Sequence, residues 1–275
     1  MKILLFFLVP LFFSAQTHRF IYEFSLKDDS TQTEKRKVNM VLDINPEEVK
    51  FYEYDYVLND SLNKTQGRNS TIWNDTPAIF RKINTNHNSS FILINNLFVL
   101  ETDDLVTWKL HNETKEKGGY LLQKATTNFG GRNWVAWFTK EIAISEGPYK
   151  FRGLPGLIFE IYDTKDNFSF SLIKSYKLGK TFSTLSIIEN FGGQKPVKIT
   201  EKMLKKMRLD HFSDPLHEFK EQYKNNTDPT ARFMVMGIEV KSLDQFKDLS
   251  ENMQNHIRKM NNPIELNKII VYPNK

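Results

Sequence analysis

Cysteine is absent from this 275-residue sequence. Its absence excludes disulfide bonds, thiolate nucleophiles, cysteine metal ligands and lipid attachment to an N-terminal cysteine. Internal repeats and low-complexity linkers are missing too, which favours one domain over several. Beyond the first fifteen residues there is no long apolar run, so we expect the mature chain not to span a membrane.

Known catalytic motifs are missing as well. The sequence has no Gly-x-Ser-x-Gly nucleophile elbow and no glycine-rich phosphate loop. Asp103 beside Asp104, and Glu141 with Glu160, are carboxylates of the kind used in glycoside hydrolysis. A structural role explains these four residues better, as solvent-facing carboxylates that alternate with apolar residues along strands. We therefore predict no catalytic residue, and a hydrolase with an unrecognised site is an alternative.

Histidine is scarce, and only one group of histidines lies close to other metal-ligand side chains. This group contains His211, Asp214, His217 and Glu218. Asp214 and Pro215 are typical of the cap and first residue of a new helix, so the two histidines do not share a helix face. Their spacing matches no zinc motif. We expect neither a metal nor another cofactor.

Positive charge slightly exceeds negative charge, with 38 Lys and Arg against 33 Asp and Glu, a net charge of +5. The two signs are interleaved along the chain. Only Lys202, Lys205, Lys206 and Arg208 form a basic cluster, on one short predicted helix. Nucleic-acid-binding proteins usually have a larger basic stripe. We therefore expect a solvated helix face and no nucleic-acid partner.

The N-terminus has the pattern of a signal peptide. Met1 and Lys2 precede an apolar stretch, residues 3–13, and Ser14 and Ala15 provide small residues before the polar segment that follows. The stretch is too short for the roughly 20 residues that cross a bilayer. Cleavage after Ala15 divides the chain into a signal peptide, residues 1–15, and one domain, residues 16–275. The sequence therefore predicts export to the periplasm or the extracellular space.

Most of the mature sequence alternates apolar and polar residues with the period of β-strands. Short strands separated by turn residues indicate antiparallel neighbours, because parallel strands need long crossover connections. The polar residues 58–90 are predicted to form loops with at most one short element. The predicted strands cover residues 20–26, 38–44, 51–57, 92–100, 106–110, 120–127, 134–144, 157–162 and 168–176.

Helical patterns occur only near the C-terminus. The spacing predicts helices over residues 201–209, 214–223 and 242–260, with a strand over 233–240. Each helix has one apolar stripe that needs a packing partner, so we expect the helices on one face or in the mouth of the sheet. The predicted fold is mainly β, in the α+β class. It is a large curved antiparallel sheet, or an incomplete barrel, with two or three C-terminal helices.

Two turn signals occur in residues 147–158. Pro155 and Gly156 lie between two leucines and occupy the central positions of a predicted type II turn, in which the glycine takes a positive φ. Gly147 and Pro148 form the other break. Apolar residues surround the Pro-Gly pair. We therefore predict a buried corner between two neighbouring strands, with a structural role and not a catalytic one.

The segment around this corner resembles the GLPGLI family of Bacteroidetes, whose name is the six-residue sequence found here at 153–158. Positions that match the pattern of this family extend from Trp108 to the Asn-Pro-Ile-Glu-Leu sequence at 262–266, so the resemblance spans most of the mature chain. The family-motif residues here are Gly147, Pro148, Gly153, Leu154, Pro155, Gly156, Leu157 and Ile158. Further matches are Tyr120, Lys124, Ala125, Phe129, Arg132, Ala136, Trp137, Glu141, Ile142 and Phe151.

Two positions depart from the family. Leu121 and Leu122 follow the family tyrosine where many members have a cysteine, and Ala143 lies where proline is common. Any role of that cysteine therefore does not transfer to this chain. The resemblance implies an exported protein of the periplasm or cell envelope, and it implies no particular reaction.

Aromatic residues are abundant, with 22 Phe, 10 Tyr and 4 Trp. An incompletely closed sheet with helices in its mouth would enclose an apolar cavity, as in the half-barrel of periplasmic lipoprotein carriers. That comparison is one of architecture alone. The alternative is that these aromatic side chains fill an ordinary hydrophobic core. The candidate ligand-facing aromatics are Tyr52, Tyr54, Tyr56, Trp134 and Trp137.

Together these observations favour an exported, non-enzymatic module that binds an apolar ligand, a lipid or a peptide against the sheet. A second hypothesis is an interaction partner of an outer-membrane transport or secretion complex, which would use strand edges or the Asn-rich loops. Either protein would need an exposed surface that the strand pattern alone does not locate.

Overall fold

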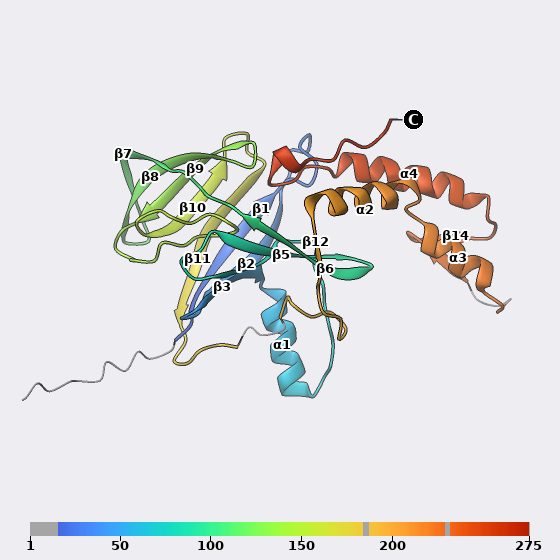
Figure 1. Ribbon diagram of the computed structural model, residues 1–275, viewed down its shortest axis with the longest axis horizontal. Coiled ribbons are helices and arrows are strands. Elements are labelled where there is room, and N and C mark those ends of the chain that lie inside the picture. Colours follow the sequence, from blue (N-terminus) through green and yellow to red (C-terminus); the bar gives the residue numbers. More distant parts are fainter. Residues whose placement is uncertain (1–15, 184–186, 229–231, 275) are drawn as a thin grey trace, which may run out of the picture.

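The computed structural model describes residues 16–183, 187–228 and 232–274, and the predicted signal peptide lies outside the described residues. Twelve strands form one sheet (Figure 1). They are β1 His18–Leu26, β2 Arg36–Ile44, β3 Glu48–Glu53, β4 Ala78–Lys82, β5 His87–Ile94, β6 Asn96–Asp103, β7 Lys109–Lys117, β8 Tyr120–Phe129, β9 Arg132–Thr139, β10 Leu157–Asp163, β11 Phe168–Lys177 and β12 Val197–Ile199. The remaining elements are α1 Asp55–Gln66, α2 Glu201–Ser213, α3 His217–Asn225, β13 Phe233–Val235, β14 Ile238–Val240, α4 Gln245–Lys259 and the 3-10 turn η1 Leu266–Lys268.

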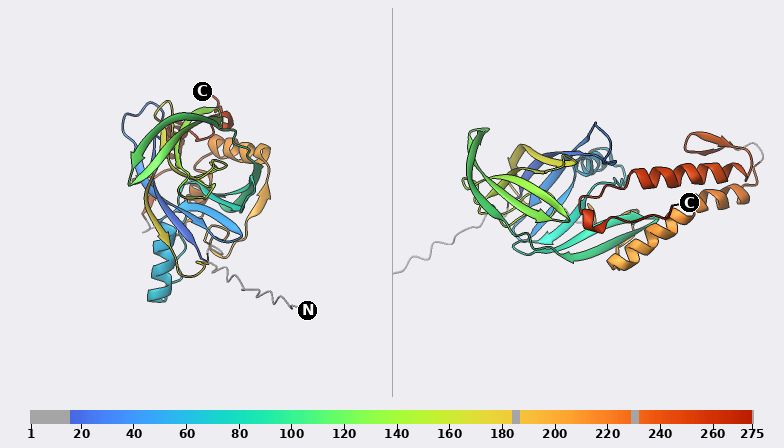
Figure 2. Two further views of the ribbon diagram at one scale, coloured as in Figure 1. Left: turned by 90° about the vertical axis from the view of Figure 1, so that its left-hand side faces the viewer. Right: turned by 90° about the horizontal axis from the view of Figure 1, so that it is seen from above.

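The sheet has the order β12-β6-β5-β4-β3-β2-β1-β11-β10-β9-β8-β7. Its neighbours are antiparallel except β12 and β6, which are parallel. Pairing of β1 with β11 joins two meanders, β1 to β6 and β7 to β11. The sheet curls strongly (Figure 2), and residues 104–108 alone connect β6 with β7. The edge strands β7 and β12 do not pair with each other within the described ranges, so the barrel is incomplete, as predicted.

Local sequence explains several boundaries. Gly130 and Gly131 join β8 to β9 with φ of 61° and 76°, the conformation of a two-residue type I′ turn. The Thr200 hydroxyl accepts a hydrogen bond from the backbone N–H of Met203 and caps α2, as predicted. These signals are local, so the sequence is sufficient to identify them.

The predicted strand over residues 51–57 is wrong beyond Glu53. β3 ends there, Tyr54 has helical angles (φ −62°, ψ −25°), and α1 begins at Asp55. The ring of Tyr56 packs edge-on against Tyr52, with centroids 6.2 Å apart. At this point the chain leaves the sheet, and the first turn of α1 packs Tyr56 against the outer face of the sheet. Residues 58–90, predicted mainly as loops, likewise contain most of α1, all of β4 and the start of β5.

The larger core lies on the concave face of the sheet. It combines alternate residues of β1, such as Phe20 and Phe24, with residues from both meanders, which can meet only on the inner side of a curled sheet. Residues 140–156, between β9 and β10, add Tyr149, Phe151 and Leu154 to the same core. This connection therefore fills the space that an apolar ligand would need.

A smaller core lies on the outer face of β1 to β6. Ile21, Val41 and Tyr52 point outward there, and α1 contributes Tyr56. Tyr56 in turn packs edge-on against Trp73, with ring centroids 6.2 Å apart. Both faces of this half of the sheet are thus covered by the chain itself.

The three C-terminal helices form an arm that extends away from the sheet (Figures 1 and 2). A separate core lies between α3, α4 and the β13–β14 hairpin, and it is built on Leu216 at the start of α3, Val235, Val240, Phe246 and Leu249. The expectation that the helices cover a sheet face or fill its mouth is wrong. Their apolar stripes pack on one another, and residues 140–156 already occupy the concave face. Within the described residues, no helix is both long enough and apolar enough to cross a bilayer.

Candidate functional site

The motif loop, defined as residues 140–156, ends in a tight bend. The N–H of Gly156 donates to the carbonyl of Leu154 at 2.8 Å, which makes a γ-turn centred on Pro155. The predicted type II turn is wrong, because the N–H of Leu157 donates to the carbonyl of Ile142 at 3.2 Å instead of to Leu154. The positive φ predicted for Gly156 is confirmed, with a value of 149°.

The bend packs against the strands it connects. A Cβ on Gly156 would lie 1.8 Å from the carbonyl oxygen of Thr139, and one on Gly147 would lie 2.7 Å from Cδ1 of Ile158. Among the other family-motif residues, Leu154, Leu157 and Ile158 are buried, Pro148 is buried beside Gly147, and Gly153 and Pro155 are exposed. The two glycines permit a backbone approach that no side chain allows.

Tyr149 is the strained residue of the motif loop. Its φ is +57°, which is uncommon for a bulky residue. Its hydroxyl donates to Oε1 of Glu265 at 2.6 Å, and its carbonyl accepts from Nη1 of Arg81 at 3.1 Å. Burial, reinforced by the negative charge of Glu265, raises the pKa of Tyr149 well above its usual value. Tyr149 is therefore a hydrogen-bond donor and not a base.

The ion cluster, defined as Asp104, Tyr149, Lys150, Glu265 and Lys268, joins the loop to the C-terminal segment. Nζ of Lys150 lies 2.7 Å from Oε1 of Glu265 and 3.0 Å from Oδ2 of Asp104, and Nζ of Lys268 lies 2.7 Å from Oε2 of Glu265. Burial alone would raise the pKa of Glu265. The charge and hydrogen bond of Lys150 and the hydrogen bonds from Lys268 and Tyr149 instead lower this pKa. Glu265 is therefore a carboxylate at neutral pH.

A second buried group fixes the loop to β4. Glu146 pairs with Arg81 of β4 and with Arg152, whose Nε lies 3.3 Å from Oε1 of Glu146. The side chains of Arg81 and Glu146 are almost fully buried. Breaking such a pair leaves an uncompensated buried charge, so this contact holds the loop in place.

The edge cleft is a hollow that opens to solvent, with a volume of about 770 Å³. Five segments surround it: the first residue of β5, the end of β6 with residues 104–105, the β8–β9 turn, β12 with the start of α2, and η1 with Glu265. Five carboxylates and two lysines line it. These carboxylates are Glu101, Asp103, Asp104, Glu201 and Glu265. With histidine neutral, the lining carries an excess of negative charge, and three members of the ion cluster, Asp104, Glu265 and Lys268, belong to its floor.

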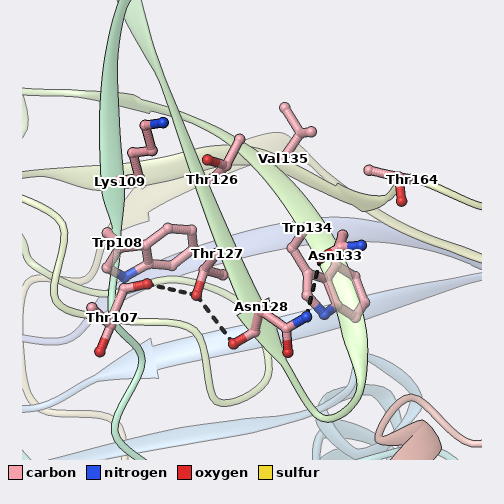
Figure 3. A pocket seen from close by; sticks show the side chains of 10 residues that line it. All are labelled: Thr107, Trp108, Lys109, Thr126, Thr127, Asn128, Asn133, Trp134, Val135 and Thr164. Carbon is pink, nitrogen blue, oxygen red and sulfur yellow. Dashed lines mark hydrogen bonds between the residues drawn. The ribbon is translucent and has the colours of Figure 1, made fainter.

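A smaller groove of about 370 Å³ lies between residues 107–109 and the β8–β9 hairpin (Figure 3). Its walls are mainly threonine hydroxyls and asparagine amides beside two indoles. The Thr127 hydroxyl donates to the carbonyl of Thr107 at 2.7 Å. The indole N–H groups of Trp108 and Trp134 are already donated, to the carbonyls of Arg152 and Phe129. Within the described part of the chain, Lys109 is the one charged residue in the lining of this groove.

The candidate ligand-facing aromatics do not share one surface. Tyr52 of β3 and Tyr56 of α1 are buried in the outer core, and Tyr54 packs at the margin of this core. Trp134 is buried in the inner core and forms part of the wall of the smaller groove. Trp137 lies half-buried, with Nζ of Lys115 4.4 Å from its ring centroid.

The other side chains weighed from sequence also take structural positions. Glu160 pairs with Lys115 and Lys117, and Glu141 accepts from the backbone N–H of Leu121 at 2.9 Å. His217 lies 3.2 Å from Asp214 at the start of α3. No group of three or more potential ligand side chains in the described ranges is arranged to hold a metal ion.

Sequence reasoning missed the ion cluster. Its members come from separate segments of the chain: Asp104 and Glu265 were considered for other reasons, and Tyr149 and Lys150 lie between the two turn signals of residues 147–158. One signal was available: Lys150 and Arg152 alternate with Tyr149 and Phe151 beside the Gly-Pro break. Charged residues that alternate with aromatic residues in a segment predicted to be buried indicate buried ion pairs, because an unpaired charge there is too costly.

Residues 130–160 match a family described as "Protein of unknown function (Porph_ging)". The matched segment contains β9, the motif loop and the first residues of β10. No curated protein shows significant sequence similarity to this chain.

Solved structures of PNGF-II have a similar fold. The structure in space group P21 has a TM-score of 0.51 at 16% identity and covers 70% of this chain and 33% of the PNGF-II chain. The structure in space group C2 has a TM-score of 0.49 at 17% identity and covers 70% and 32%. This chain thus spans about a third of the length of the PNGF-II chains, and the likeness concerns the fold alone.

Proposed function

We propose that this chain is an exported, non-enzymatic module of the cell envelope that binds a charged ligand in the edge cleft. One contrast carries the proposal. The concave face of the sheet is filled by the motif loop, whereas the edge cleft is open, has a volume of about 770 Å³ and has three members of the ion cluster in its floor. Ligand sites are usually concave and have a few polar groups held in fixed positions.

The electrostatics of the cleft favour binding over proton transfer. A general acid at neutral pH needs a carboxyl group with a raised pKa. The pKa of Glu265 is lowered, by Lys150 and Lys268, against the effect of its own burial. The pKa of Glu101 is lowered as well, first by its hydrogen bond with Lys198. Both groups are fixed charges that suit recognition of an ionic ligand.

Export and family are part of the same proposal. The N-terminal basic, apolar and small-residue segments support secretion with cleavage after Ala15. The matched residues 130–160 include the six residues that name the GLPGLI family, which supports GLPGLI-type identity for the whole mature domain. N-terminal sequencing of the exported protein tests the first point. A chain that starts at Gln16 supports it, and retention of Met1 contradicts it.

Binding is tested with ligands of defined charge. Isothermal titration of residues 16–275 with spermine, citrate and a fatty acid compares a cation, an anion and an apolar ligand. We expect spermine to bind and the other two not to bind. A double charge reversal, Asp103→Lys with Glu201→Lys, should abolish spermine binding, because both side chains line the cleft and are well exposed.

The matched control is Glu34→Lys with Glu116→Lys, which makes the same charge change on exposed residues outside the cleft. Spermine binding should survive in this control. Binding of the fatty acid alone, unaffected by either double variant, would instead support an apolar ligand against the sheet. Absence of all binding would contradict the edge cleft as a ligand site.

A second candidate function is favoured by the helical arm. Met234, Met236 and Ile238 of the β13–β14 hairpin are each about half exposed. Exposed apolar side chains close together are typical of protein contacts, which suits a partner of an outer-membrane transport or secretion complex. Affinity capture from a native envelope with the wild type and with Met236→Ser, Ile238→Ser tests it. A partner lost with these substitutions supports this function, and an identical capture by both proteins contradicts it.

A further inference from the structure

We infer that the edge cleft binds an extended, positively charged peptide segment, which adds as a strand to the end of β6. This inference rests on the proposed function and specifies its ligand. Three observations carry it: the incomplete pairing of β6, the path of β12 beside it, and the charge of the surrounding walls.

The first observation concerns the two edges of β6. On one side β5 pairs with its whole length, from Ile94↔Asn96 to His87↔Asp103. On the other side β12 pairs only with Phe98–Leu100 in the described chain. Residues 101–103 therefore extend beyond the end of β12. A strand edge presents backbone N–H and C=O groups that another extended chain can pair with.

The second observation is that this edge already accepts an extended segment. β12 is a short strand that lies parallel to β6, and it contributes little besides the buried side chain of Ile199. After Ile199 the chain turns away at Thr200 into α2. The open space that follows in line with β12 is the edge cleft, which is lined by residues 100–105. Residues 101–103 are the part of β6 beyond its pairing with β12, so about three residues of a ligand can pair there.

The third observation is the charge on either side of this edge. Glu101 lies on one face of β6, where it contacts His87 and Lys198. On the opposite face, the Thr102 hydroxyl accepts from Nζ of Lys150 at 3.1 Å, near Glu265 of the ion cluster. Side chains of an added strand alternate between these two faces. Asp103 lies on the same face as Glu101 and its side chain is 83% exposed, so a basic residue at every second position of an added strand can pair with it.

The edge at the other end of the sheet lacks this combination. β7 is exposed along most of its length, and its sequence contains four basic and two acidic residues if His111 is counted. Its register with β8 is interrupted between Leu110 and Thr114. Charged side chains and irregular register are the features by which natural edge strands avoid pairing. β6 is therefore the better of the two edges for strand addition, and its cleft is the one with complementary charge.

The test uses residues 16–275 and four probes of defined composition. They are a short peptide that alternates lysine and threonine, the same peptide with N-methylated backbone amides, an alternating glutamate–threonine peptide, and spermine. We expect the lysine–threonine peptide to bind and the glutamate–threonine peptide not to bind. N-methylation should weaken binding by about tenfold or more, since it removes backbone hydrogen bonds, each of which contributes about a factor of ten at most.

The position of the ligand is read from hydrogen exchange. The lysine–threonine peptide should slow exchange at the backbone amides of residues 101–105, and spermine should not. The double variant Asp103→Lys, Glu201→Lys should lose the peptide, while the Glu34→Lys, Glu116→Lys control should keep it. These variants change exposed side chains, so folding is checked by their unchanged thermal midpoints.

The outcomes separate this inference from the proposed function. Equal affinity for the methylated and unmethylated peptides, or protection outside residues 100–105, overturns strand addition. If spermine and both basic peptides bind the cleft alike, the cleft binds cations and the proposed function holds, but the inference fails. If no probe binds, both fail together.

Discussion

Nζ of Lys150 lies 2.7 Å from Oε1 of Glu265, a residue 115 positions later in the chain. Both side chains are almost fully buried. This contact joins the middle of the motif loop to the segment that follows the helical arm. The loop, the end of β6 and the C-terminal segment therefore meet at one ionic centre, and part of that centre belongs to the floor of the edge cleft.

Replacement of Lys150 by methionine should destabilise the protein by about 3–5 kcal/mol, because it leaves Asp104 and Glu265 as buried carboxylates without their shared cation. The measurement is the free energy of unfolding from urea denaturation. Lys124→Met is the control, since Lys124 pairs with the exposed Glu113 and should cost at most about 1 kcal/mol. Similar losses in the two variants would show that the ion cluster does not have this role.

Acid should weaken the protein through Glu265. Its pKa is lowered in the folded state from an ordinary value of 4.5, so its contribution to stability is fully present above that value. The contribution is lost as the pH falls through the lowered folded-state pKa, because the unfolded chain then binds the proton more readily. Urea midpoints measured from neutral pH downward should therefore fall less steeply below 4.5 in Glu265→Gln than in the wild type. If the urea midpoints of the two proteins fall in parallel below pH 4.5, Glu265 does not have a lowered pKa in the folded state.

Gly156→Ala should prevent the native bend. The added Cβ would lie 1.8 Å from the carbonyl oxygen of Thr139, and the φ of 149° is unfavourable for any L-residue. Backbone strain of this kind costs about 1–3 kcal/mol by itself, and the clash adds to it. Gly119→Ala is the control, since its φ is +81° and its Cβ would meet nothing within 4 Å. Calorimetric midpoints should fall much further for Gly156→Ala, and equal falls would refute the close approach.

Leu154→Ala should create an apolar cavity inside the half-barrel. Leu154 is buried in the inner core, so its truncation should cost about 2–5 kcal/mol. A dry cavity of this kind binds small apolar molecules. We therefore expect benzene to bind Leu154→Ala and not the wild type, and we expect a larger fluorescent apolar dye not to bind the wild type. Strong dye binding by the wild type would indicate that the motif loop does not fill the concave face.

Prediction from the sequence was accurate where the signal was local. The alternation of apolar residues predicted β1, β2, most of β3 and β8 to β11, and the Pro-Gly pair located a bend. It missed β4, and it merged β5 and β6 into one strand over residues 92–100. The strand prediction failed at Tyr54 and Tyr56. A period of two in the sequence does not reveal that the chain leaves the sheet after Glu53 and starts a helix that packs on its outer face. Prediction also failed for the type of turn at Pro155, since the N–H of Leu157 is taken by a residue fifteen positions earlier, Ile142.

By itself, the sequence determined the class of the fold, the antiparallel pairing of consecutive strands and the need for glycine at position 156. These depend on residues that are close in the chain, where pattern and backbone sterics are sufficient. Only the tertiary structure decided that β1 pairs with β11, that the motif loop occupies the concave face, and that Lys150 meets Glu265 beside an open strand edge. Such contacts depend on the curvature of the whole sheet, and no periodicity in the sequence encodes which distant charges that curvature brings together.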